Sequence, residues 1–167
     1  MSCNKLTFPY LVIMKKWHLL SFLLASLMFS GCSINRYFIL SNSTDETISI
    51  KYSLDDPTGE KAIFGVSGEV YQSNRDYYPN WEHKLPYRDL NNSDKTVSIN
   101  LGPKSTLIFG TLLNDDYNTN TKTSTTGKVF NLIEMTFSVN GIDFFIDKDN
   151  FHDFFLEDGG TYKYVIR

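Results

Sequence analysis

The residues best suited to binding chemistry lie in one aromatic segment, residues 71–90. Its tyrosines and its tryptophan are interleaved with arginines and prolines. Exposed aromatic rings beside hydrogen-bonding side chains make good recognition surfaces for sugars and for proteins. We therefore predict a ligand-binding surface in this segment, formed by Tyr71, Arg75, Tyr77, Tyr78, Trp81, Tyr87 and Arg88.

The same rings have a structural explanation that competes with a binding role. Aromatic side chains bury a large apolar area, so a cluster of them can cap one end of a fold as a satellite core. The exposure of Trp81 separates the two interpretations, because a binding surface requires an accessible ring and a satellite core requires a covered one.

A second group of candidate residues is acidic. Residues 147–150, Asp-Lys-Asp-Asn, resemble the start of an EF-hand calcium loop. The sixth position of that loop needs Gly and holds His152, and the twelfth needs Glu and holds Asp158. We therefore predict no metal site and no cofactor. A cation site of another kind remains open for Glu134, Asp143, Asp147 and Asp149.

A targeting segment precedes the rest of the chain. Lys15 and Lys16 form a short basic region, and the 13 residues 17–29 are mostly apolar. A helix of that length covers about 20 Å, less than the roughly 30 Å hydrocarbon layer. This layout predicts a secretory signal peptide, residues 1–31, and disfavours a permanent transmembrane helix. The segment is complete from Met14, so one interpretation of residues 1–13 is an over-extended start.

The end of this segment resembles the lipobox of bacterial lipoproteins. That pattern is typically Leu, a small residue, Gly or Ala, and then Cys; here Phe29-Ser30-Gly31-Cys32 departs from it at Phe29. The resemblance implies cleavage before Cys32, a lipid on its thiol and acylation of the new N-terminus. Two or three acyl chains, at about 0.8 kcal/mol per buried CH₂, anchor a protein stably to a membrane.

The residues after the cysteine bear on localisation. In the enterobacterial sorting pattern an Asp directly after the cysteine retains a lipoprotein in the inner membrane, so Ser33 implies the outer membrane. No acidic run follows Cys32, which favours the periplasmic face over surface export. Residues 32–36 form a short tether, because the four residues after the cysteine reach at most about 14 Å.

Catalytic motifs are absent from the sequence. The chain beyond the leader has two histidines, His83 and His152, and its one cysteine is Cys32. Lipidation of that thiol would exclude a Cys/His nucleophile. The sequence has no Gly-x-Ser-x-Gly elbow and no His-Glu-x-x-His motif. We predict that the protein is not an enzyme.

Composition excludes several other classes. The 167 residues are 41% hydrophobic and 15% aromatic, which is too apolar for a disordered chain and suits one domain. A net charge of −3 leaves no basic footprint for nucleic acid. Two cysteines exclude a disulfide-dense scaffold.

The body of the chain shows the two-residue period of β-strands. Residues 47–54 alternate apolar and polar side chains, and residues 96–101 do so up to the Gly102-Pro103 break. Residues 37–40, 105–113 and 161–166 also read as strands, with Gly110 a candidate β-bulge. One short helix is expected at residues 150–156.

The strongest local signal is Asn140-Gly141. This dipeptide suits a two-residue type I′ turn, since both positions need positive φ. The register that follows from this turn pairs Val139 with Ile142 at one end of the hairpin and Glu134 with Asp147 at the other. The last pair places two carboxylates opposite each other. Six apolar residues of the hairpin then share one face: Met135, Phe137, Val139, Ile142, Phe144 and Ile146.

These patterns predict an all-β fold for residues 37–167. We expect an antiparallel β-sandwich of about seven or eight strands, broadly Ig-like in architecture, with a small β-barrel as the alternative. Two long segments should interrupt the strands: residues 71–90, and residues 114–127 as a flexible excursion or a hairpin tip.

Together these features predict a lipid-anchored, non-catalytic binding module for a protein or a glycan, with the membrane as a partner through the lipid. The alternative is a structural or accessory subunit of a cell-envelope complex. An open, uncharged edge strand or a flat apolar patch would favour that alternative.

Overall fold

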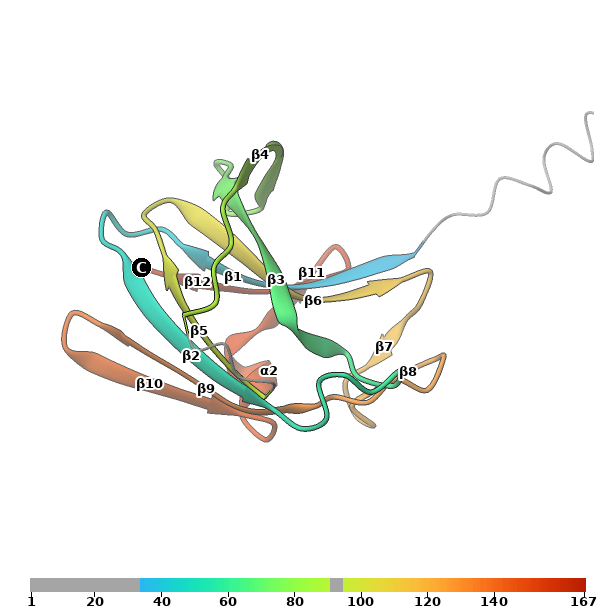
Figure 1. Cartoon of the computed structure of the whole chain (residues 1–167). Coiled ribbons are helices and arrows are strands. Elements are labelled where there is room, and N and C mark those ends of the chain that lie inside the picture. The colour runs from blue at the N-terminus through green and yellow to red at the C-terminus, as the bar shows by residue number, and fades with distance from the viewer. Residues whose placement is uncertain (1–33, 91–94) are drawn as a thin grey trace, which may run out of the picture. The chain divides into compact units, whose positions relative to one another are not determined.

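The fold consists mainly of two β-sheets, one with six strands and one with four (Figure 1). The computed structural model describes residues 34–90 and 95–167; the predicted signal peptide and Cys32 lie outside them. The larger sheet has the order β11 (Leu156–Asp158), β12 (Thr161–Ile166), β1 (Asn35–Asn42), β6 (Ser105–Leu113), β3 (Phe64–Ser73), β4 (Pro79–Leu85). The smaller has the order β10 (Ile142–Asp147), β9 (Leu132–Val139), β2 (Ile48–Leu54), β5 (Thr96–Leu101).

The predicted all-β sandwich is confirmed. Both sheets are open, and the buried apolar residues of both form one core between them. Among the strand pairs described, β1 and β12 are parallel and the others antiparallel, with Tyr37 opposite Thr161. None of the helical structure in residues 34–90 and 95–167 is long and apolar enough to cross a bilayer.

Period-two patterning places the core where the sequence predicts it. Along β2 the alternation is strict: Ile48, Ile50, Tyr52 and Leu54 are buried and the residues between them are more exposed. On β12, Tyr162 and Ile166 face the same core, with Tyr164 packed against it.

The Asn140-Gly141 hairpin has the predicted register throughout, from Ile142 opposite Val139 to Asp147 opposite Glu134. Asn140 and Gly141 have φ values of 52° and 77°, as a type I′ turn requires. The Asp147 carboxylate accepts the N–H groups of Asp149 and Asn150, and these bonds lower its pKa. They keep the carboxylate charged opposite Glu134.

The structure corrects two predicted boundaries. Residues 71–90 are not one long loop, because β3 runs to Ser73 and β4 follows after a tight turn. The charged run Glu82-His83-Lys84 and the initial proline obscure β4 in the sequence. The first strand also begins earlier than predicted, since β1 starts at Asn35 and includes Arg36.

The remaining segments agree with the sequence more closely. Within residues 114–127, β7 (Tyr117–Asn118) pairs with β8 (Thr123–Ser124), so this segment is a hairpin. The short helix, α2, covers Phe151–Phe154 with Asn150 as its N-cap residue.

The predicted bulge in β6 is present, and it depends on Gly110. The register with β1 shifts at this point, with Phe38 opposite Gly110 and Ile39 opposite Ile108. A Cβ atom on Gly110 would lie 2.6 Å from the ring of Phe64 and 3.1 Å from the ring of Phe38. Phe64 is itself held against Phe109, with ring centroids 5.2 Å apart, so it has no room to move.

We predict that Gly110→Ala lowers the free energy of unfolding by about 1–3 kcal/mol, the usual cost of overpacking a dense core. Urea denaturation followed by circular dichroism measures this. Gly102→Ala is the matched control and should change stability by less than about 0.5 kcal/mol, because the nearest atom to its added Cβ, Ser105 Oγ, is 3.9 Å away. Equal stability of the two variants would contradict the packing described here.

Candidate functional site

An aromatic surface lies on the outer face of the six-stranded sheet, away from the core. Ile39 of β1, Tyr71 of β3 and Ile108 of β6 form a small apolar cluster there, separate from the main core, with Tyr37 and Tyr78 against it. Trp81 of β4 lies over this cluster, its ring centroid 5.4 Å from that of Tyr37 and 5.3 Å from that of Tyr71. We call Tyr37, Tyr71, Tyr78 and Trp81 the aromatic surface.

The irregular pairing of β4 accounts for the position of Trp81. Ser73 lies opposite Pro79 and Tyr71 opposite Lys84, so β4 has more residues than β3 over the same stretch. Surplus residues in one strand bulge out and redirect their side chains. Trp81 lies in this stretch and contacts Tyr37, although β6 separates β3 from β1 in the sheet.

The exposure of Trp81 distinguishes an accessible aromatic surface from a covered satellite core. Trp81 is 55% exposed, whereas Tyr71 beneath it is 7% exposed. Tyr71 and Ile39 therefore act as a satellite core, and Trp81 presents an accessible ring that this core supports.

Charged side chains of both signs flank the rings. The Glu69 carboxylate accepts a hydrogen bond from Tyr71 Oη at 3.0 Å and another from Lys84 Nζ. The bond from Lys84 lowers the pKa of Glu69, while burial and the bond to Glu69 raise the pKa of Tyr71. Both groups are therefore held in their usual ionisation states, with Glu69 charged and Tyr71 neutral.

Tyr78 is fixed on the other side of the surface. Lys163 Nζ lies 3.7 Å from the centroid of the Tyr78 ring and 3.3 Å from Asp158 Oδ2. Tyr78 Oη donates to the Asp158 carbonyl at 3.2 Å. Burial, followed by the hydrogen bond to Asp158, raises the pKa of Tyr78 to about 12, so this hydroxyl stays neutral.

The other predicted site residues do not join these rings as one group. Tyr77 lies in the turn before β4 with a φ of 64°, its ring centroid 6.0 Å from the Arg167 guanidinium. Arg75 and Arg88 are exposed. Tyr87 packs against the main core, and its Oη donates to the Val66 carbonyl at 2.8 Å, which gives it a structural role.

Four residues at this surface, Tyr37, Glu69, Lys84 and Lys163, were not predicted from the sequence. Tyr37 carried a usable signal, because it alternates with the core residue Phe38 on a strand. The other three come from separate strands, β3, β4 and β12, and only the order of the strands in the sheet brings them to one surface.

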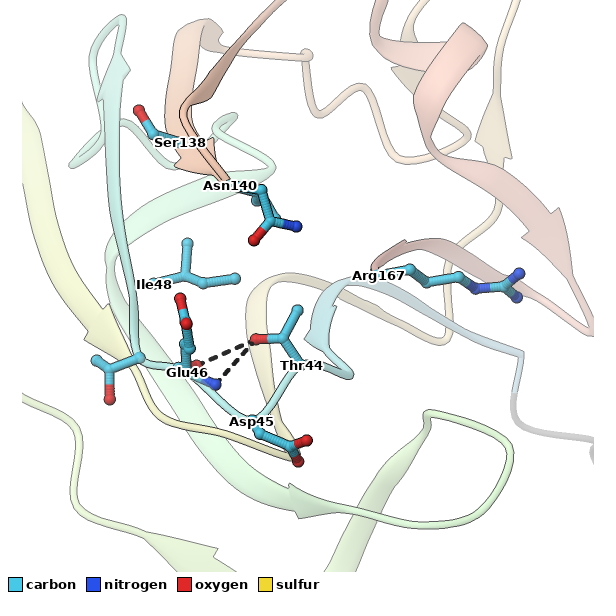
Figure 2. Close-up of a pocket in the computed structure, with 9 residues that line it drawn as sticks. Thr44, Asp45, Glu46, Ile48, Ser138, Asn140 and Arg167 are labelled. Atoms are coloured by element: carbon cyan, nitrogen blue, oxygen red, sulfur yellow. Dashed lines mark hydrogen bonds between the residues drawn. The ribbon is translucent and has the colours of Figure 1, made fainter.

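A hollow of about 360 Å³ at one end of the sandwich is a second candidate (Figure 2). The turn between β1 and β2, the hairpin turn and Arg167 line it. Two of its polar side chains already have partners: Asp45 pairs with Lys104 at 3.1 Å, and Thr44 Oγ1 donates to the Glu46 carbonyl at 3.2 Å. Figure 2 shows the Arg167 side chain directed away from these groups, so the hollow offers no convergent set of polar atoms.

Asp115 has the most perturbed carboxylate, but its contacts are structural. Burial alone would raise its pKa; bonds from the hydroxyls of Thr125 and Thr126 and from the Thr126 N–H outweigh burial and hold the pKa well below its usual range. These bonds stabilise the β7–β8 hairpin by joining the residues that follow β8 to Asp115, which precedes β7. Because these bonds hold the buried carboxylate within the hairpin, they account for Asp115 as a structural residue.

His152 meets a tyrosine and not the nearby acidic residues. Its Nε2 atom lies 3.2 Å from Tyr117 Oη, and burial, with Lys122 nearby, lowers its pKa. His83 is on β4, in a different element. Across residues 34–90 and 95–167, no three histidine, cysteine or carboxylate side chains are grouped as metal ligands.

Comparisons with protein-family models, with curated proteins and with solved structures found no match to this chain. The candidate site therefore rests on its own geometry.

We predict that Asp115→Asn destabilises the protein by about 1–3 kcal/mol at pH 7, because hydroxyl donors lose a charged acceptor. The folded pKa lies below the unfolded value of about 3.9, so this stabilisation is complete above that value and is lost as the pH falls further. Urea denaturation at pH 7 and pH 3 should show the gap between wild type and variant narrowing. Asp45→Asn, whose carboxylate is exposed, is the control and should change stability little at either pH.

Proposed function

We propose that the protein is a lipid-anchored, non-catalytic binding module that holds a glycan on its aromatic surface. The anchor is the lipid on Cys32, and the location is the periplasmic face of a bacterial outer membrane. The observation that supports a binding role most directly is the exposed ring of Trp81 on a buried aromatic support.

A glycan fits this surface better than a protein does. The C–H face of a pyranose ring packs on one flat aromatic ring, while its hydroxyls need donors and acceptors nearby. Trp81 supplies the ring, and the Glu69–Lys84 pair supplies both kinds of polar group. A protein hot spot usually has several apolar anchors in a desolvated centre, whereas Tyr71, Ile39 and Ile108 are already buried here.

The support beneath Trp81 suits weak ligands such as sugars. Tyr37 and Tyr71 touch the indole from two strands, so the ring is already held before a ligand arrives. Binding then requires little ordering of the protein, which is a main cost of association.

The lipid anchor rests on the lipobox resemblance and agrees with where the domain begins. The first strand begins at Asn35, three residues after Cys32, and Tyr37 of the aromatic surface is two residues further. Five residues span at most about 18 Å. A lipid on Cys32 would therefore keep this surface near the membrane.

The glycan proposal predicts a specific loss of binding in Trp81→Ala. The probes are linear β-1,4-linked hexasaccharides of glucose and of N-acetylglucosamine, titrated into the protein by isothermal calorimetry. Removal of the stacking ring should weaken binding at least tenfold, and Trp81→Phe should fall between wild type and Trp81→Ala.

Phe145→Ala is the matched control, because Phe145 is 53% exposed but lies on the other sheet; it should bind like wild type. The proposal would be contradicted if neither hexasaccharide bound the wild-type protein. It would also be contradicted if Trp81→Ala and Phe145→Ala lost the same amount of binding affinity. A protein ligand that depends on Trp81 would support the alternative class of binding module.

A further inference from the structure

The four edges of the two large sheets differ in how they are protected against pairing with further strands. Strand β11 has only three residues, and β4 carries Glu82, His83 and Lys84. Short and charged edges resist pairing. The edge of β5 is covered by the segment before it, because Leu90 N–H donates to the Ser98 carbonyl at 2.7 Å and Ser98 N–H donates to Asp89 Oδ1 at 2.9 Å.

The edge of β10 is only half covered. In a hairpin with a two-residue turn the pair next to the turn exchanges both hydrogen bonds, so Asp143, Phe145 and Asp147 direct their backbone groups away from β9. The Asn150 side chain satisfies two of these groups: its Nδ2 donates to the Phe145 carbonyl at 3.1 Å, and its Oδ1 accepts from Asp147 N–H at 2.8 Å.

The other half of the edge has no such cover. Within residues 34–90 and 95–167, no loop or side-chain group bonds to the N–H or carbonyl of Asp143 or to the N–H of Phe145. The apolar side chains beside these groups are accessible, with Ile142 62% exposed and Phe145 53% exposed. This part of β10 therefore combines free backbone groups with exposed apolar surface.

Charge limits what can pair there. Strand β10 carries Asp143 and Asp147 and no basic residue, and Glu134 lies opposite Asp147. Asp143, Phe144 and Phe145 line a second hollow beside β10, and the one cation among its described lining residues, Lys51, is on β2, beyond β9. A strand that brings a cation opposite Asp143 would therefore complement this edge.

We propose that an extended segment of another polypeptide adds to β10 as an antiparallel strand, paired through Asp143 and Phe145. Its inward residues are apolar and extend the core face beside Ile142 and Phe144, and its outward residue opposite Asp143 is Lys or Arg. This is strand addition at a sheet edge. The site is separate from the aromatic surface and goes beyond the proposed glycan binding.

A second copy of this chain fits the edge less well. Antiparallel self-pairing centred on Asp143 would set two carboxylates opposite each other, which is destabilising. A shift by two residues would pair Asp143 with Phe145, whose carbonyl already accepts from Asn150. Self-association is therefore an outcome that the test must exclude.

The test uses a synthetic hexapeptide, acetyl-VVKVTV-amide, titrated into the ¹⁵N-labelled full chain in detergent micelles. Amide chemical shifts should move along residues 142–147 and leave Trp81 unchanged. The same peptide methylated on the backbone nitrogen of its lysine loses the donor to the Asp143 carbonyl and should bind at least tenfold more weakly.

Charge reversal provides the matched variant. Asp143→Lys should bind the lysine peptide at least fivefold more weakly and should prefer the peptide with glutamate in its place. Asp143→Asn, which keeps the shape of the side chain, should bind both peptides about equally. The amide spectrum of each variant shows whether its fold is intact.

Three results would overturn the proposal. The first is that the lysine peptide does not bind at 2 mM. The second is that the methylated and unmethylated peptides bind equally well. The third is that the chemical shifts of residues 142–147 change with protein concentration and not with added peptide. The last would assign the edge to a second copy of the chain. None of these bears on glycan binding, which is read out at Trp81.

Discussion

Strand β1 is covered on both faces, and both the core and the aromatic surface depend on this. Its inward residues Phe38 and Leu40 are fully buried between the sheets. Its outward residues Tyr37 and Ile39 support the cluster beneath Trp81. Burial on both sides favours apolar residues at successive positions, as in the continuous run from Tyr37 to Leu40; the buried Ser41 and Asn42 that follow are hydrogen-bonded. Any disturbance of β1 would therefore reach the core and the candidate site together.

The aromatic surface and the β10 edge use different physical devices on different sheets. On the six-stranded sheet, a bulged edge strand brings an exposed ring over a buried support, and the charged residues of β4 discourage pairing. On the four-stranded sheet, β10 keeps a regular register and leaves three backbone groups uncovered. One surface is suited to side-chain recognition of a small ligand and the other to backbone pairing with a strand.

Much of the fold could be predicted because local rules were enough. Period-two patterns located β2, β5 and β12, and the Asn140-Gly141 turn fixed the register of β9 and β10. The candidate site was only partly predictable. The sequence pointed to Trp81 and Tyr71, but Tyr37 and Lys84 join them through a bulge and across an intervening strand. Such contacts depend on sheet order, which no short-range pattern encodes.

The proposed lipid on Cys32 would hold the proposed binding module at a membrane. This anchor is tested most directly by the intact mass of the protein extracted from bacterial membranes after expression from Met14, beside the Cys32→Ala variant. We expect a wild-type chain that begins at Cys32 and carries added acyl chains, and a variant without them. A wild-type chain that retains residues 14–31 and carries no lipid would contradict the anchor and, with it, the outer-membrane location.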